Sequence, residues 1–351
     1  MANKLRDSFD WYGAVAQAAG GIWSSFGNAT LNAANTRFGV GQSAALAVNS
    51  SNVALQASFS NTTNVVFFTF AHMLNIALTG SLSTSWRFND TATTQFEIRL
   101  SENGSISFYR GTGTLLGTYG GAIPGSGKWV HFQIKIVIDS VNGEFHVRKN
   151  GNSNDDYTLT GVNNSGAGTT KVNGITTTGN SLTVPSAQYY DDMWIFDNNN
   201  LGDGAPFDWI GDVRSIQIVA NSDIVTNLNR SAGALNYANI DELINSLTDY
   251  NYSSVPGAYD EYGNAGWGSY NPSQILGLSV RSQMYKDVAG NREGACRIRS
   301  GASAAVGPSV AVGTSSTSQP VWYYVDLDPA TSAPWSQSGV ANLAFGPIVN
   351  V

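Results

Sequence analysis

Apolar and polar residues alternate along much of this chain, and the alternation is clearest over residues 128–138. Every second residue in that stretch is apolar, namely Val130, Phe132, Ile134, Ile136 and Ile138. A period of two is typical of a β-strand with one buried face. The dipeptide Asn142-Gly143 follows, and a second alternating stretch covers residues 144–148. Because Asn-Gly favours a tight turn, the pattern predicts a β-hairpin.

The same reasoning predicts further strands in both halves of the chain. Residues 95–100 and 105–109 alternate on either side of a Glu-Asn-Gly turn and predict a second hairpin. Residues 65–70 are almost all apolar, as expected for a strand covered on both faces. Residues 186–197 predict one more strand. In the C-terminal half, strands are predicted at residues 212–220, 275–284, 295–299 and 321–327.

A polar segment at residues 198–208 has the composition of a linker between these two sets of strands. We therefore predict an all-β protein with two β-sandwich (jelly-roll) domains, residues 1–205 and residues 206–351. One short helix is predicted at residues 239–247, where Ile240, Leu243, Ile244 and Leu247 recur at helical spacing. The chain shows no repeat period and no heptad or collagen-like pattern, so no fibrous shaft is expected.

Composition narrows the classes of partner. The formal net charge is -7, the pI is about 4.9, and only 12% of residues are charged. Nucleic-acid binding needs clustered Lys and Arg, so nucleic acid is not an expected partner. Cys296 is the single cysteine, so no disulfide can form within the chain. The first residues lack the apolar core of a signal peptide, and no apolar run reaches membrane-spanning length. We expect synthesis and folding in a reducing cytoplasm and no membrane contact.

Catalytic motifs were sought among the acidic and nucleophilic residues. A glycosidase needs two carboxylates about 5 to 10 Å apart across the sugar bond. Asp191, Asp192 and Asp197 share one predicted strand, but alternation places Asp192 opposite the other two, and Asp191 is six residues from Asp197. The chain also lacks the Gly-x-Ser-x-Gly motif of serine hydrolases and a phosphate-binding loop. These patterns predict a protein that is not an enzyme, with no cofactor.

Metal sites have little support in the sequence. His131 and His146 face the same way across the first predicted hairpin, but they lack a third ligand, so we expect solvated side chains rather than a zinc site. The segment 197–208 is rich in oxygen ligands. Its possible calcium ligands are Asp197, Asn199, Asp203 and Asp208. Leucine occupies one ligand position and Asp208 replaces the bidentate glutamate, so we favour a polar linker over a calcium site.

An aromatic loop at residues 249–272 is the remaining candidate for binding. Its rings are Tyr250, Tyr252, Tyr259, Tyr262, Trp267 and Tyr270. Long loops often carry function, and Tyr and Trp combine a rigid apolar ring with a polar tip. The rings could pack on their own domain, contact a neighbouring subunit or bind a glycan. We predict an interface or glycan contact.

Short motifs in both predicted domains form an ordered set along the chain. The motifs of the first domain are Asp7-Ser8-Phe9-Asp10-Trp11-Tyr12, Thr36-Arg37-Phe38-Gly39, Lys128-Trp129-Val130-His131 and Tyr189-Tyr190-Asp191-Asp192-Met193-Trp194. Those of the second are Gly211-Asp212-Val213-Arg214, Arg299-Ser300-Gly301 and Phe345-Gly346-Pro347. In this order the motifs resemble those of tailed-bacteriophage virion proteins that carry a laminin-G or concanavalin-A-like domain. The resemblance implies a laminin-G/concanavalin-A-like first domain, a virion location and synthesis in a host bacterial cytoplasm, and it transfers no ligand residues.

The leading hypothesis is therefore a non-enzymatic virion structural protein, either a tail-associated adhesin or fibre component or a capsid decoration. Its expected partners are other virion proteins, copies of itself and a host surface glycan. The alternative is a carbohydrate-binding lectin module, and a polysaccharide-degrading enzyme is the third possibility. A structural subunit needs a large patch that neighbours cover, a lectin needs an aromatic groove, and an enzyme needs a carboxylate pair.

Overall fold

The computed structural model describes most of the chain. The described residues are 3–9, 12, 23–27, 29–38, 41–47, 53–59, 63–75, 83–166, 168–179, 187–198, 209–211, 214, 216, 218–241, 249–268, 270–287, 289–313 and 319–350. Two compact units form. Unit 1 comprises residues 1–200 with 206–215, and unit 2 comprises residues 201–205 with 216–351. The predicted domain boundary at residue 205 lies outside the described residues.

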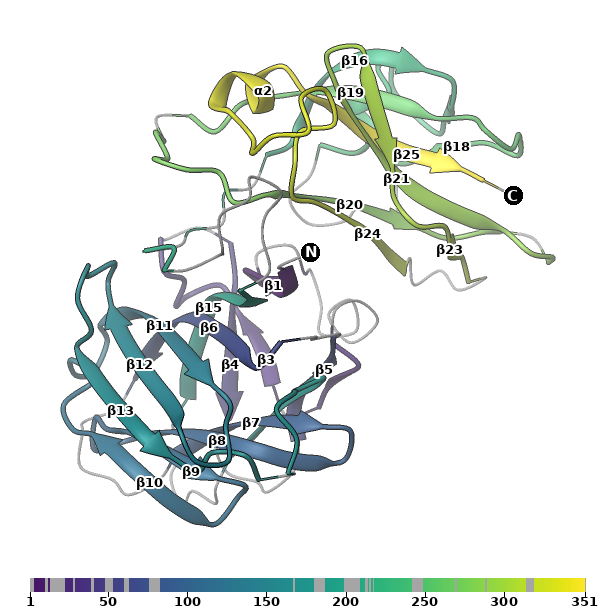
Figure 1. Cartoon of the computed structure of the whole chain (residues 1–351). Coiled ribbons are helices and arrows are strands. Elements are labelled where there is room, and N and C mark those ends of the chain that lie inside the picture. The colour runs from purple at the N-terminus through teal and green to yellow at the C-terminus, as the bar shows by residue number, and fades with distance from the viewer. Residues whose placement is uncertain are drawn as a thin grey trace. The chain divides into compact units, whose positions relative to one another are not determined.

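Unit 1 is a sandwich of two antiparallel sheets (Figure 1). The strands of the first sheet, in spatial order, are β13 (Tyr157–Val162), β12 (Gly143–Lys149), β11 (Trp129–Val137), β6 (Val65–Leu74), β15 (Ala187–Asp197), β4 (Ser43–Ala47) and β3 (Ala29–Asn32), with β1 (Asn3–Asp7) paired to β15. The strands of the second are β10 (Thr114–Tyr119), β9 (Ile106–Arg110), β8 (Thr93–Ser101), β7 (Ser83–Asp90), β14 (Gly174–Gly179), β5 (Val53–Ser58) and β2 (Ser25–Phe26).

Aromatic side chains fill the space between these sheets. The ring centroids of Phe68 and Trp86 are 5.4 Å apart, and those of Phe108 and Phe145 are 4.7 Å apart. Each pair joins one sheet to the other, and all four rings are fully buried. Burial of such rings is the main favourable term in folding this unit.

The predicted strands of unit 1 are confirmed. Strands β11 and β12 pair as a hairpin, and so do β8 and β9. Every residue of β6 is buried, since this strand lies between β11 and β15 with both faces covered. The predicted strand at residues 186–197 is β15. The alternation of apolar and polar residues therefore predicted these strands correctly.

Unit 2 is a second antiparallel β-sandwich. Its larger sheet consists, within the described residues, of β16 (Ala220–Thr226), β19 (Asp260–Asn264), β25 (Ala344–Val349), β21 (Glu293–Ser300) and β22 (Ser303–Val306), with β23 (Val310–Ala311) paired to β21. A two-stranded sheet of β20 (Leu278–Met284) and β24 (Gln319–Val325) provides the facing layer. Val280, Val321 and Ile298 belong to one buried cluster between these layers. The predicted all-β fold with two β-sandwich domains is thus confirmed.

Unit 2 also contains a buried acid that binds two arginines. Glu261 on β19 is 1% exposed, and its carboxylate accepts hydrogen bonds from Arg297 Nε at 2.7 Å and from Arg299 Nε at 2.6 Å. Both arginines lie on β21, so the carboxylate links two strands of the larger sheet that are not direct neighbours. Removal of one partner from such a buried ion pair strongly destabilises a protein, because the other charge is left without a counter-charge.

One strand predicted for the C-terminal half is wrong. The described residues 214, 216, 218 and 219 lie outside any strand, and β16 begins only at Ala220. Ile218 packs against the core of unit 2 without strand pairing, so the apolar spacing there reflects packing of an irregular segment. Of the helix predicted at residues 239–247, the described part is residues 239–241, where Asn239 ends a 3₁₀ turn η1 (Tyr237–Asn239). Residues 242–247 lie outside the described residues, so the helix stays a prediction.

The helices of the described residues are η1 and the five-residue α2 (Gln337–Ala341). Helix α2 begins at Ser336, whose hydroxyl accepts a hydrogen bond from the backbone N–H of Gly339 at 2.9 Å. Ser336 thus caps the helix and satisfies one donor of its first turn. Neither helix has the length and apolar character needed to cross a membrane.

Candidate functional site: an exposed tyrosine cluster

The structure divides the rings of the aromatic loop into buried and exposed groups. Tyr262 on β19 is fully buried, which removes it from the predicted contact set. Its hydroxyl donates a hydrogen bond to Asp260 at 2.7 Å, and burial together with this bond raises the pKa of Tyr262. Trp267 packs partly buried against the core of unit 2, and Tyr259 lies half-buried under the guanidinium of Arg297 at 4.5 Å. These three rings therefore serve the fold.

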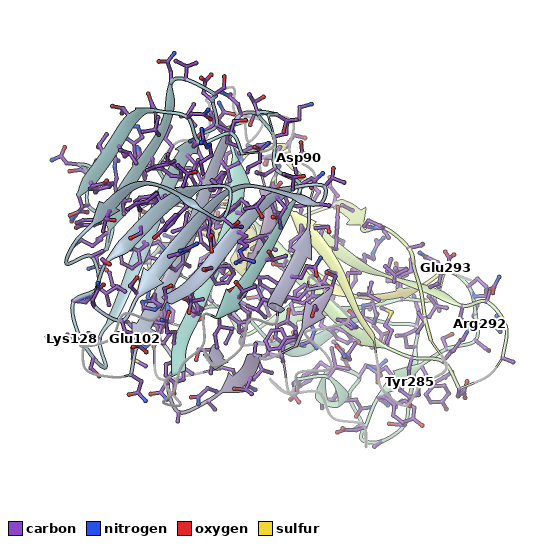
Figure 2. All side chains as sticks on the ribbon, turned by 90° about the horizontal axis from the view of Figure 1, so that it is seen from below. Asp90, Glu102, Lys128, Tyr285, Arg292 and Glu293 are labelled. Carbon is purple, nitrogen blue, oxygen red and sulfur yellow. The ribbon has the colours of Figure 1, made fainter. Side chains whose placement is uncertain are left out.

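Tyr250, Tyr252 and Tyr285 form an exposed group on unit 2, called here the tyrosine cluster. Their side chains are 39%, 51% and 37% exposed. The ring centroid of Tyr250 lies 6.1 Å from that of Tyr252 and 6.2 Å from that of Tyr285. Figure 2 labels Tyr285, which follows directly after β20. Tyr270 is also exposed, at 41%, and is not one of the three rings of the cluster.

The segment that carries Tyr250 and Tyr252 is held by hydrogen bonds to residues 229–231. Strand β18 (Asn251–Tyr252) pairs with β17 (Asn229–Arg230). The backbone N–H of Tyr250 donates to the Ser231 hydroxyl at 2.8 Å, and its carbonyl accepts from the Ser231 N–H at 2.9 Å. These bonds fix the main chain, so the two rings project from a defined backbone.

A buried polar network anchors this segment to the sheet. The side-chain amide of Asn251 donates to the Tyr262 hydroxyl at 2.8 Å, and Tyr262 donates to Asp260. Asp260, which is fully buried, also accepts from the backbone N–H groups of Asn227 and Leu228 at 2.8 Å each. A satisfied network of this kind rigidifies its surroundings. The exposed rings are therefore presented on an ordered foundation.

One exposed carboxylate acts on the phenol of Tyr285. Burial, the neighbouring Tyr250 and the carboxylate of Asp287 together raise the pKa of Tyr285. Asp287 is exposed and lies two residues after Tyr285. The adjacent cation Lys286 is engaged, since its Nζ donates to the carbonyl of Gly290. The cluster thus offers aromatic faces, phenolic hydroxyls and a hydrogen-bond acceptor.

Sequence reasoning missed Tyr285 because it lies outside the aromatic loop. Its ring reaches Tyr250 only through the tertiary arrangement of β20 beside the loop. The sequence does show Tyr285 as an aromatic residue directly after the strand predicted at residues 275–284. That signal alone does not indicate which other ring lies nearby.

The three acids of β15 are all buried and do not form an exposed catalytic pair. Asp192 binds Arg37 at 2.8 Å, and Asp191 accepts a hydrogen bond from the backbone N–H of Arg37 at 3.2 Å. A bulge between Asp191 and Trp194 shifts the alternation. Asp191 pairs with residue 71 of β6 and Asp197 with residue 66, so these two acids lie on opposite faces. The prediction that Asp191 and Asp197 lie on the same face of the strand is therefore wrong.

The part of the chain that the structure describes contains no assembled metal-binding site. No group there of three or more His, Cys, Asp or Glu could hold a metal ion. Asp197 is fully buried at the end of β15, whereas Asn199, Asp203 and Asp208 lie outside the described residues. That residues 197–208 form a polar linker rather than a calcium site therefore stays a prediction.

The expectation of two solvated histidines is wrong for His131, which is 1% exposed. His146 lies on the outer side of β12 between two carboxylates, with Nδ1 2.7 Å from Asp155 and Nε2 2.9 Å from Glu144. Partial burial opposes ionisation of Asp155, but hydrogen bonds from Arg148 and His146 lower its pKa overall. This is a surface ion-pair group.

Comparisons with known proteins find only distant structural likenesses. No protein-family model and no curated protein matches the chain. Cellulose induced protein Cip1 is 15% identical with a TM-score of 0.39, covering 54% of this chain and 96% of its own. The catalytic domain of a glycoside hydrolase family 131 protein from Coprinopsis cinerea is 11% identical (TM-score 0.37; 56% and 94% covered). The Ca2+-bound exoplasmic/lumenal domain of VIP36 is 10% identical (TM-score 0.35; 56% and 90% covered). Likenesses this distant transfer no residue role or activity.

Proposed function

We propose that this chain is a non-catalytic carbohydrate-binding protein and that the tyrosine cluster of unit 2 contacts the glycan. The observation that carries the proposal is the gathering of three tyrosine rings at the surface. The ring centroid of Tyr250 lies 6.1 Å from that of Tyr252 and 6.2 Å from that of Tyr285. Exposed, contiguous aromatic surface is uncommon unless a ligand or partner covers it. This proposal takes up the alternative hypothesis from the sequence rather than the leading one.

Tyrosine suits a sugar ligand for a physical reason. The face of its ring packs against the C–H groups of a pyranose, while its hydroxyl exchanges hydrogen bonds with sugar hydroxyls. Asp287 adds an acceptor beside Tyr285. The hydrogen-bonded backbone beneath Tyr250 reduces the ordering cost of binding, because little main-chain freedom remains to be lost.

Affinity electrophoresis in gels that contain soluble polysaccharides tests the proposal. Tyr250→Ala and Tyr285→Ala should each weaken binding by about 5- to 30-fold, which corresponds to about 1–2 kcal/mol for one aromatic contact. Tyr270→Ala is the matched control, because Tyr270 is equally exposed but stands outside the cluster. Equal loss in all three variants, or no retardation by any polysaccharide, would contradict the proposal.

The virion role is a second proposal and rests on the motif resemblance alone. A glycan-binding unit is compatible with a tail-associated adhesin, in which the chain would contact host surface glycan and other virion proteins. Visualising this chain in intact particles tests the role. Its absence from purified particles would exclude a virion location and leave the glycan-binding proposal standing.

A further inference from the structure

The three rings of the tyrosine cluster do not share a plane, and this restricts the form of ligand that they can bind. The ring of Tyr250 is inclined by 59° to that of Tyr252 and by 68° to that of Tyr285. A flat crystalline polysaccharide presents many sugar rings in one plane. Only coplanar aromatic rings can stack on such a surface together, since stacking requires nearly parallel faces.

Resting on the proposed function of the same site, we infer that the tyrosine cluster selects single, uncharged glycan chains and excludes both crystalline polysaccharide surfaces and acidic glycans. A single chain is free to turn its sugar faces from one residue to the next. It can therefore present one face to Tyr250 and an inclined neighbouring face to Tyr252 or Tyr285. The ligand class follows from the angle of the Tyr250 ring to Tyr252 on the same segment and to Tyr285 on another segment.

The charges around the cluster support the preference for uncharged sugars. Asp287 is exposed beside Tyr285 and presents a carboxylate to any ligand on that ring. The cations Lys286 and Arg292 keep their charges while they donate to the backbone carbonyls of Gly290 and Asn291, and Asp287 is the charged side chain that acts on the phenol of Tyr285. A carboxylate accepts hydrogen bonds from sugar hydroxyls but repels uronic or sialic acid groups.

Matched pairs of polysaccharides test the inference on the full-length protein. The first pair is microcrystalline cellulose against acid-swollen amorphous cellulose, with crystalline against amorphous chitin beside it, all by pull-down. The second is neutral hydroxyethylcellulose against carboxymethylcellulose in affinity gels, with dextran, mannan and galactan as further neutral probes and alginate and hyaluronan as acidic ones. We expect binding to at least one neutral amorphous or soluble polysaccharide, at least 10-fold weaker binding to its crystalline form, and no binding to the acidic chains.

Asp287→Asn removes the carboxylate beside Tyr285 and leaves the three rings in place, so it tests the effect of charge alone. It should raise binding to acidic chains by about 2- to 5-fold at low ionic strength, with the gain lost at 0.5 M salt, as expected for an exposed charge. Binding to crystalline or acidic polysaccharide as strong as to the neutral soluble form would overturn the inference while leaving glycan binding intact. No binding to any probe by a folded protein would instead refute the proposed function, and the inference with it.

Discussion

His72 should make unit 1 sensitive to mild acid. The imidazole lies in the sandwich interior on β6 and is fully buried. Its Nε2 is 3.1 Å from Gln188 Oε1, which also accepts a hydrogen bond from the Tyr190 hydroxyl at 2.9 Å. Among the described residues, no hydrogen-bond partner faces Nδ1. Protonation would therefore place a charge and an unpaired N–H donor in the core.

The size of the effect follows from the pKa of His72, which burial lowers from 6.5 to about 4 despite the hydrogen bond that its Nε2–H donates to Gln188 Oε1. Because the folded pKa lies below the unfolded one, the unfolded chain binds more protons between these pH values. Stability from this group is complete above pH 6.5 and is lost as the pH falls towards 4. Linkage gives a loss of about 2 kcal/mol at pH 5, or roughly 4–8 °C in melting temperature for a unit of this size.

Thermal melts of the full-length protein between pH 7.5 and pH 5 measure this loss. His72→Gln keeps a donor near Gln188 and cannot become charged, so its melting temperature should change little over the same range even if its absolute stability is lower. His146→Gln is the matched control, because His146 lies at the surface. An unchanged acid response in His72→Gln, or a pH-independent melt in the wild type, would refute the argument that the buried imidazole is the sensitive group.

Three further predictions concern unit 2. Glu261→Gln should lower the free energy of unfolding by roughly 2 kcal/mol in urea titrations, because two partly exposed guanidinium groups lose their buried counter-charge. Gly346→Ala should cost about 1–3 kcal/mol, since a Cβ would overlap the backbone oxygen of Asp260, whereas Gly113→Ala has open space and should be neutral. Burial raises the pKa of the Cys296 thiol to about 11, so a thiol reagent at pH 8 should label it only as fast as unit 2 unfolds. Rapid labelling of the folded protein would contradict that placement.

Several elements of the fold could be predicted from the sequence because their signals are local. Strand β11 and its hairpin partner β12 follow from an alternation of two residues and an Asn-Gly turn. The apolar run of β6 predicted a strand covered on both faces, since a half-exposed strand would carry polar residues at alternate positions. The all-β class followed from many such short segments.

The candidate site depended on information that the sequence does not carry locally. Alternation placed Asp191 and Asp197 on one face, but a bulge, which leaves no mark in the composition, separates them. The aromatic loop was visible as a whole, yet only tertiary packing decided that Tyr262 is buried and Tyr250 exposed.

The chain's own pattern of apolar positions determined the strands, the hairpins and the sandwich class, because burial of one strand face requires that pattern. The tertiary structure alone decided which distant segments meet, and so joined Tyr285 to Tyr250 and Tyr252. The physical reason is that strand formation depends on neighbours one and two residues away. The position of a ring relative to another ring depends instead on sheet register and loop packing over tens of residues.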